Sequence, residues 1–155
     1  MEPDSITKIR VYLDNCTYNR PYDDQSQIRI SLETQAKLYI QRLIIDKKLD
    51  LVCSYMSVYE NNENPNSGHR DSVQQFFYYA SEFIDIDKAD IIEKCAEILK
   101  KDTIKANDAI HLACAIEGKC DYFLTTDDGI IKKIHKQNIH ICNPINFVSE
   151  VYYNA

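Results

Sequence analysis

The chain has 155 residues, of which 45% are hydrophobic and 27% are charged, and its formal net charge at pH 7 is −6. This length and composition are typical of a globular protein with one sizeable core, so we expect a single domain over residues 1–155. The acidic balance argues against a surface coated in basic residues for non-specific nucleic-acid binding, while leaving room for a local basic groove. There is no apolar run of membrane-spanning length and no Cys-x-x-Cys pair, which predicts a reduced, cytoplasmic protein with no membrane contact.

The first predicted strand is the short apolar run of residues 9–13, which ends abruptly in the carboxylate of Asp14. Residues 15–27 are polar and contain Pro21, so this segment is predicted to be a loop. Apolar residues then recur at helical spacing over residues 28–44, which predicts a long amphipathic helix. Its expected buried face consists of Ile28, Leu32, Ala36, Tyr39, Ile40, Leu43 and Ile44.

Residues 49–55 form a second apolar run and are predicted to be a buried strand. Ser57, with Glu60 three residues later, has the pattern of a capping box and predicts the start of a short helix. The asparagine-rich segment 61–68, which contains Pro65, is expected to end this helix quickly.

Two further helices are predicted over residues 71–83 and 88–101, with a possible short strand at 84–86 between them. The expected inward side chains of the first helix are Val73, Phe76, Phe77 and Ala80. Those of the second helix are Ile91, Ile92, Cys95, Ala96 and Leu99.

The stretch from Lys105 to Asp128 predicts a helix followed by a buried strand. Asn107 or Asp108 is expected to cap the helix, and Gly118 is expected to stop it. The expected core-facing stripe of this helix is Ala109, Ile110, Leu112, Ala113 and Ile116. Residues 122–126 then have the β-branched and aromatic content of a buried strand that ends in Asp127.

The remaining residues predict a brief helix after Asp128, a final strand over residues 139–142, and a last helix. Asn143 and Pro144 are a suitable cap and first residue for that last helix. Strands and helices therefore alternate along the chain. This alternation predicts an α/β fold, a three-layer α/β/α sandwich with a mostly parallel central sheet.

Four carboxylates are expected at one edge of this sheet. Asp14 and Asp127 end strands, Glu60 follows a strand by a few residues, and Asp108 opens a helix, so all four project where parallel strands finish. Each alone has an ordinary explanation as a helix-start or turn residue. Together they repel one another unless protonated or bridged by a cation, and an all-oxygen set suits Mg²⁺ or Mn²⁺. The pattern therefore points to metal-assisted cleavage of phosphate esters.

Four ordered segments carry a resemblance to a known family: Leu13-Asp14 after a strand, Ser57-x-x-Glu60, Asn107-Asp108-Ala-Ile-His-Leu-Ala, and Phe-Leu-Thr-Thr-Asp127. In this order and spacing, the chain resembles a PIN domain. The resemblance implies a Mg²⁺- or Mn²⁺-dependent endoribonuclease acting on single-stranded or structured RNA, typified by VapC-like toxins. It also implies an antitoxin partner if the toxin role applies, and homodimers are common in the family.

By motif matching, Asp14, Glu60, Asp108 and Asp127 take the acidic, metal-binding positions of the family, with Asp14 and Asp108 anchoring the main ion. Thr125 matches a hydroxyl residue that supports the site. The sequence leaves open whether Glu60 or Glu63 is the metal ligand. It also leaves open whether Asp127 or Asp128 is the ligand at the end of the strand. The supporting residues predicted beside these acids are Asn15, Asn107 and Asp128.

An acidic site needs nearby cations to hold an anionic strand, and the predicted phosphate contacts are Arg20, Lys101, Lys105 and Lys132. Tyr18 and Tyr22 are candidates for stacking on a base. His111, one turn after Asp108, is expected to be a partly exposed helix residue rather than a phosphate contact.

Two other functions are compatible with parts of this pattern. A phosphate-transfer domain of the haloacid dehalogenase type needs a second aspartate two residues after the first-strand acid, where this chain has Cys16. The stronger alternative is a non-catalytic PIN-like module that binds RNA or protein. Its marker is a lost acid, and all four acids are present here.

Overall fold

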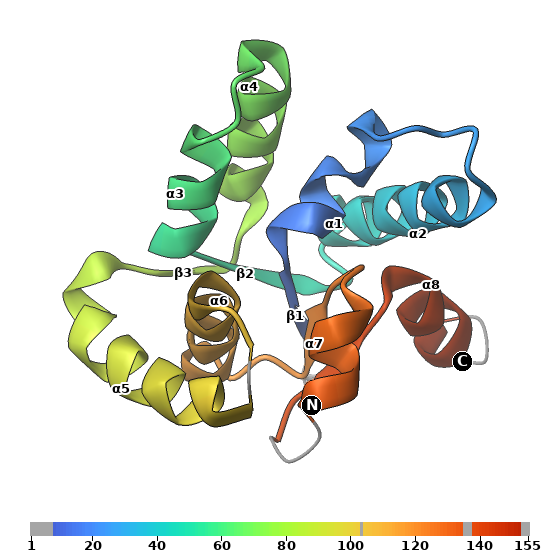
Figure 1. Cartoon of the computed structure of the whole chain (residues 1–155). Coiled ribbons are helices and arrows are strands. Elements are labelled where there is room, and N and C mark those ends of the chain that lie inside the picture. Colours follow the sequence, from blue (N-terminus) through green and yellow to red (C-terminus); the bar gives the residue numbers. More distant parts are fainter. Residues whose placement is uncertain (1–7, 103, 135–137, 153–155) are drawn as a thin grey trace, which may run out of the picture.

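The computed structural model describes residues 8–102, 104–134 and 138–152, and the sheet that these residues form has five strands in the order β3-β2-β1-β4-β5 (Figure 1). Every neighbouring pair of strands is parallel. The bounds are β1 Arg10–Leu13, β2 Asp50–Ser54, β3 Glu82–Ile84, β4 Tyr122–Leu124 and β5 His140–Cys142. The predicted α/β class with a parallel central sheet is confirmed.

The helices fill the connections between these strands. They are α1 Asn15–Asn19, α2 Ile28–Ile45, α3 Tyr55–Asn62, α4 Ser67–Phe76, α5 Ala89–Leu99, α6 Ala106–Glu117, α7 Asp128–Lys133 and α8 Pro144–Phe147. Short 3₁₀ turns lie at Arg20–Tyr22, Phe77–Tyr79, Ile86–Lys88 and Lys100–Asp102, and a π-helical turn at Val148–Tyr152. None of the described helices is long and apolar enough to cross a membrane.

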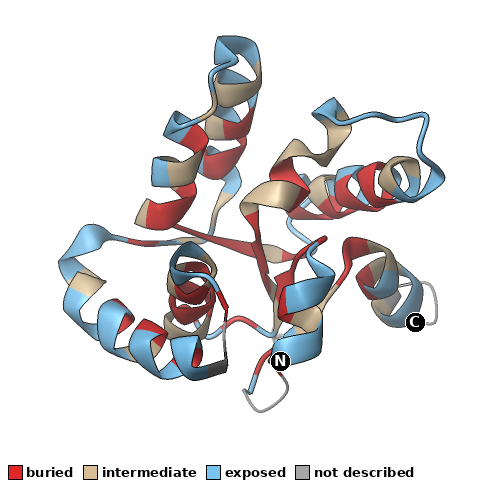
Figure 2. Ribbon diagram, viewed as in Figure 1, coloured by how far each residue is buried: buried red, intermediate tan, exposed pale blue. Residues whose placement is uncertain are grey.

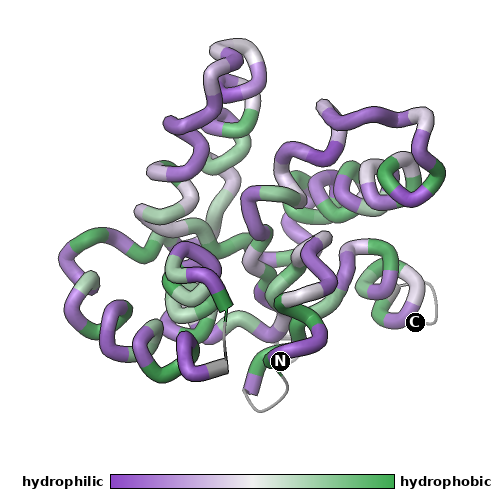
Figure 3. The backbone as a smooth tube through the Cα atoms, in the orientation of Figure 1, coloured by the Kyte–Doolittle hydropathy of each residue, from purple (hydrophilic) through white to green (hydrophobic). Residues whose placement is uncertain are grey.

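The sheet is buried on both faces, as Figure 1 shows by the placing of α5 and α6 on one side and α2 and α8 on the other. Successive side chains of a strand point to opposite faces, so Val11 and Leu13 pack with Ile40 of α2 while Tyr12 packs with Leu112 of α6. Figure 2 shows the buried residues on the strands and on the helix sides that face them. Figure 3 shows the hydrophobic positions gathered in the same interior places.

The loop predicted directly after Asp14 is wrong, because α1 begins there. The Asp14 side chain caps this helix by accepting a hydrogen bond from the backbone of Asn15. Tyr18 anchors it, since its side chain is buried with its ring centroid 6.1 Å from that of Phe76 and 5.3 Å from that of Phe77. A five-residue helix is too short to show a period in the sequence, so its cap and its anchor decide its formation.

The predicted buried face of α2 is partly wrong. Ile28, Leu32 and Tyr39 are 78%, 46% and 48% exposed, whereas the charged side chains of Glu33 and Lys37 are buried. Apolar residues lie around most of this helix, so periodicity alone does not select the side that meets the sheet. Ile91, predicted to point inward from α5, is 57% exposed, because the buried side of α5 is the side of Ile92, Ala96 and Leu99.

Three predicted helix starts also differ in the structure. Ser54, not Ser57, caps α3, because the chain passes from β2 into the helix without a loop, and Ser57 becomes its capping-box partner. The cap position of α6 is Lys105, which places Asn107 and Asp108 inside the first turn rather than at the cap. The helix predicted over residues 71–83 instead begins at Ser67 and stops before β3.

Lys37 is a buried lysine, and we expect its burial to lower the stability of the folded protein by a measurable amount. Its Nζ donates to Gln41 Oε1 at 2.7 Å and lies 5.8 Å from the centre of the Phe76 ring, and it has no ion-pair partner among the described residues. Burial lowers the pKa of Lys37 to about 8. Lys37→Met is therefore expected to stabilise the protein at neutral pH by about 2 kcal/mol.

The sign of this effect fixes its pH dependence. Between about pH 8 and 10.5 the unfolded chain holds a proton that folded Lys37 has lost, so the wild type gains stability as the pH rises. The advantage of Lys37→Met should therefore shrink above pH 8 in thermal melts. Lys48→Met, at an exposed lysine, is the matched control. Equal changes in melting temperature in the two variants would show that burying Lys37 does not destabilise the protein.

Candidate metal centre at the carboxyl edge of the sheet

Asp14 is held rigidly where β1 ends. Its Oδ1 accepts a hydrogen bond from the backbone of Asn15 at 2.8 Å, and its Oδ2 accepts one from Thr125 Oγ1 at 2.8 Å. Thr125 directly follows β4, is fully buried, and also accepts a hydrogen bond from the backbone of Asp127 at 3.1 Å. One hydroxyl therefore holds both the carboxylate of Asp14 and the backbone of Asp127, which follow two neighbouring strands.

Asp108 lies half-buried in the first turn of α6, where the charges of the other acids affect its pKa. Burial raises the pKa of Asp108 to about 6, and the negative charges of Asp14, Asp127 and Glu60 add to this shift. The charge of His111 acts in the opposite direction. The four carboxylates expected at this edge thus lie close enough for Asp108 to be destabilised by the other three.

Glu60 reaches this edge from the middle of α3 rather than from its first turn. Its Oε1 lies 2.9 Å from His111 Nε2. His111, expected to be partly exposed, is instead 1% exposed. Its other ring nitrogen, Nδ1, is hydrogen-bonded to the hydroxyl group of Tyr12 on β1, at 2.6 Å. Glu63 lies at the end of α3 and lines the same hollow as Glu60.

Asp127 and Asp128 face different surroundings. Asp127 caps α7 by accepting a hydrogen bond from the Gly129 backbone at 2.8 Å, and it lines a hollow of about 210 Å³ together with Asp108 and Lys105. Asp128 instead receives both terminal nitrogens of Arg29 at 2.8 Å, which lowers its pKa. The geometry therefore favours Asp127 over Asp128 as a member of the acid group.

The donor set fits a hard divalent ion. It consists of carboxylate oxygens, which Mg²⁺ and Mn²⁺ prefer, and their mutual repulsion would be relieved by a cation. Among the described residues, no three His, Cys, Asp or Glu side chains approach closely enough to chelate an ion together. Asp108 and Asp127 line one hollow and Glu60 lines another, so an ion at this edge would keep several waters and bind one or two carboxylates directly, as Mg²⁺ commonly does.

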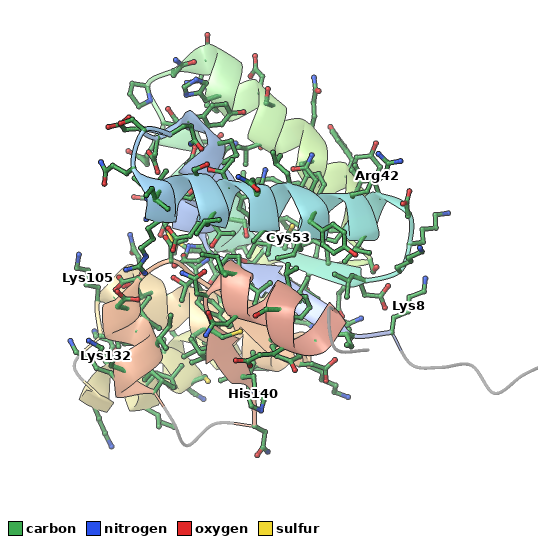
Figure 4. The ribbon with its side chains drawn as sticks, turned by 90° about the vertical axis from the view of Figure 1, so that its right-hand side faces the viewer. Lys8, Arg42, Cys53, Lys105, Lys132 and His140 are labelled. Carbon is green, nitrogen blue, oxygen red and sulfur yellow. The ribbon has the colours of Figure 1, made fainter. Side chains whose placement is uncertain are left out.

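The predicted phosphate contacts are not equally placed. Lys105 is exposed where α6 begins, and Lys132 lies on α7, on the same side of the molecule as Lys105 (Figure 4). Lys101 is exposed in the turn before α6. Arg20 is already paired, because its Nε donates to Glu33 at 2.9 Å and its guanidinium also binds Asp23.

The remaining predicted residues lie around the rim. Asn15 accepts a hydrogen bond from Asn19 Nδ2 at 3.2 Å and lines a hollow of about 420 Å³ beside Glu60, while Asn107 is exposed next to Asp108. Tyr18 is buried, so its predicted stacking on a base is wrong. Tyr22 is exposed and stacks on His69 with 3.7 Å between ring centroids.

Glu33 was not foreseen as a site-supporting residue, yet it is completely buried on α2. It accepts hydrogen bonds from Arg20, from Arg29 at 3.2 Å, and from the Asn143 side chain. Arg29 also binds Asp128, so the network joins α2 to the start of α7, beside Asp127. The spacing of Arg29 and Glu33 was a visible signal, but nothing local marked Glu33 as buried.

Comparisons with known proteins agree with this architecture. Residues 40–137 match the family model described as PIN domain. The crystal structure of FitAcB from Neisseria gonorrhoeae is 17% identical, with a TM-score of 0.56 over 86% of this chain and 97% of that chain. VapBC2 from Rickettsia felis, bound to a promoter DNA fragment, is 16% identical, with a TM-score of 0.53 over 87% and 98%. No curated protein matches the sequence.

Proposed function

This chain belongs to the PIN domain family, and from that premise we propose that it is a divalent-metal-dependent endoribonuclease acting on single-stranded or structured RNA. PIN domains are generally metal-dependent nucleases. The observation that carries the proposal is the position of the acids at the carboxyl edge of the sheet: Asp14 follows β1, while Asp108, in the first turn of α6, lines one hollow with Asp127, the cap of α7. The negative charges of Asp14, Asp127 and Glu60 add to the burial that raises the pKa of Asp108 to about 6. A carboxyl group under this repulsion favours a bound cation.

The residues divide the work as follows. Asp14 and Asp108 would hold the ion, with Glu60 and Asp127 completing the site directly or through waters. When bound, Mg²⁺ or Mn²⁺ would supply positive charge for the phosphate and would activate water for its hydrolysis. Thr125 fixes the position of the Asp14 carboxylate relative to the Asp127 backbone through its two hydrogen bonds. Asn15 and Asn107 border these acids and orient bound waters.

Lys101, Lys105 and Lys132 are the proposed contacts to RNA phosphates. Lys105 lines the hollow that holds Asp108 and Asp127, so it can balance the negative charge of the site while holding an anionic strand. Arg20 is left out of this set, because its guanidinium is committed to Glu33 and Asp23.

We further propose that the protein is the toxin of a toxin–antitoxin pair, with a protein antitoxin as partner and a homodimer as its own assembly. The support is the fold similarity to VapBC2, whose structure was solved with promoter DNA. Co-purification of this protein with the product of a neighbouring small reading frame, and loss of its nuclease activity in that complex, would test the toxin role.

The nuclease proposal is tested with the purified protein and a labelled single-stranded RNA. Cleavage is expected with Mg²⁺ or Mn²⁺ and is expected to stop when EDTA removes the ion. If no RNA is cut with either ion while RNA still binds, the non-catalytic binding module becomes the better assignment.

Asp108→Asn is expected to stabilise the metal-free protein. Because the pKa of Asp108 is raised from 3.8 to about 6, the folded chain keeps a proton that the unfolded chain has lost between these pH values. Stability of the metal-free wild type therefore falls as the pH rises through this window. At neutral pH the variant should gain about 1 kcal/mol, a figure reduced to allow for the partial exposure of the carboxyl group.

The ion should reverse this order in thermal melts. Mn²⁺ is expected to raise the melting temperature of the wild type clearly and that of Asp108→Asn little. Asp87→Asn, at an exposed acid on another part of the chain, is the control and should respond to Mn²⁺ as the wild type does. An equal response of Asp108→Asn would remove Asp108 from the ion site.

A further inference from the structure

A chain of buried polar side chains runs through the interior between β1, β2, α3 and α6, and it ends at Glu60. Its members are Ser54, Ser57, Tyr12 and His111, with exposures of 0%, 5%, 0% and 1%. Buried polar groups are costly unless they are paired, and each of these has a partner within the chain. Because this series of polar side chains ends at Glu60, a candidate site acid, we infer that it does more than pack the core.

The contacts are short and continuous. Tyr12 OH lies 2.7 Å from Ser54 Oγ, 3.1 Å from Ser57 Oγ and 2.6 Å from His111 Nδ1. On the far side of the imidazole ring, His111 Nε2 lies 2.9 Å from Glu60 Oε1. Tyr12 and His111 also meet edge to face, with 5.6 Å between ring centroids.

The donors in this chain have a preferred direction. Ser54 Oγ accepts the backbone N–H groups of Met56 and Ser57 at 3.2 Å and 3.3 Å, so its own hydrogen is available to Tyr12. Burial raises the pKa of Tyr12 well above its ordinary value, so its phenol keeps a proton to donate to His111 Nδ1. With the Tyr12 phenol donating to Nδ1, the imidazole hydrogen left to donate is the one on Nε2, the atom that faces Glu60.

The ring is the fixed partner and the carboxylate is the adaptable one. His111 is 1% exposed and is held at Nδ1 by the Tyr12 hydroxyl, whereas the Glu60 side chain is 20% exposed. The Nε2–H does not point along the line to Oε1, so the present contact is close but bent. Glu60 lines the hollow that also holds Asn15 and Glu63, and its negative charge is one of those that add to the raised pKa of Asp108, so its carboxylate lies beside the acid group.

We infer that His111 is a positioning residue, which holds one carboxylate oxygen of Glu60 so that the other faces the shared acid site, with Tyr12 fixing the ring. The inference rests on the proposed metal site. Because His111 is buried, it does not reach an RNA strand, so it acts through Glu60 and not on substrate. Groups that orient metal ligands commonly change metal affinity by about 10- to 100-fold.

The test compares Mn²⁺ affinity, measured from the electron paramagnetic resonance signal of free Mn²⁺, in matched variants. His111→Leu is expected to weaken binding by about 10-fold because Glu60 loses its donor. His111→Gln is expected to stay close to the wild type, since the glutamine amide nitrogen can replace Nε2. In the Glu60→Gln background, His111→Leu should have no further effect, because the residue through which it acts has changed.

A second measurement uses the intact wild type and needs no variant to fold. Nitrogen-15 spectra of labelled histidine should show a hydrogen on Nε2 of His111. A ring protonated at Nδ1 alone in the wild type would overturn the inference, because Nε2 would then have no hydrogen to offer Glu60.

The outcomes separate this inference from the proposed function. If the wild type binds Mn²⁺, Asp14→Asn loses it, and a folded His111→Leu binds as well as the wild type, the positioning role is wrong while the site stands. If His111→Leu weakens binding equally with and without Glu60, its effect is general and the inference fails. If the wild type does not bind Mn²⁺ or Mg²⁺, both proposals fall.

Discussion

Asp14→Asn is expected to lower divalent-ion-dependent RNA cleavage by at least about 100-fold without unfolding the protein. Asparagine has the same shape and remains a good helix cap, so α1 should still form from the Asn15 backbone contact. The variant loses a negative oxygen, and the amide placed there donates where Oδ2 accepted from Thr125. Initial cleavage rates of labelled RNA at equal protein concentration measure the effect.

The matched control is Asp46→Asn, at an exposed acid where α2 ends, paired with Arg42. It makes the same chemical change away from the carboxyl edge and should cut RNA at the wild-type rate. Equal cleavage by Asp14→Asn and the wild type would point to a contaminating nuclease and remove the catalytic assignment of Asp14.

Glu33→Gln should lower the free energy of unfolding by about 3 kcal/mol, the largest stability effect expected in this chain. The carboxylate is completely buried and pairs with Arg20 and Arg29, so its neutralisation leaves two guanidinium groups without their shared partner. Arg29 is 53% exposed and can recover water, which keeps the loss near the lower end for a broken buried pair. Urea unfolding followed by circular dichroism gives the difference.

Glu97→Gln is the appropriate comparison, because Glu97 is an exposed helix acid paired with Lys100 at 3.3 Å. Surface pairs of this kind contribute about 0–1 kcal/mol, so its unfolding midpoint should barely move. A Glu33→Gln midpoint equal to that of Glu97→Gln would mean that the buried network does not stabilise the link between α2 and α7.

Much of the sheet could be predicted, because its strands are short runs of apolar residues bounded by polar ones. All five expected strands are present, with ends that differ by one or two residues. The direction of the chain then made the meeting of Asp14, Asp108 and Asp127 foreseeable, since parallel strands finish at a common edge. No knowledge of side-chain packing was needed for that step.

Helix ends and helix faces were less predictable. Ser54, Ser57 and Asn107 are all plausible caps by residue type, and only the path of the backbone selects among them. Along α2, apolar residues surround the helix, so the buried position of Glu33 depends on Arg20, 13 residues earlier, and Asn143, 110 residues later. Local periodicity carries no information about such partners.

The amino-acid sequence by itself determined the parallel α/β order and the chain positions of the four acids, because strand runs, helical spacing and strand-end carboxylates are local patterns. The tertiary structure decided which groups lie against those acids: Thr125 against Asp14 and the Asp127 backbone, and buried His111 beside Glu60, while Arg29 pairs with Asp128. The physical reason is that hydrogen bonds and burial depend on approach in space between segments tens of residues apart. That approach exists only after the chain has folded.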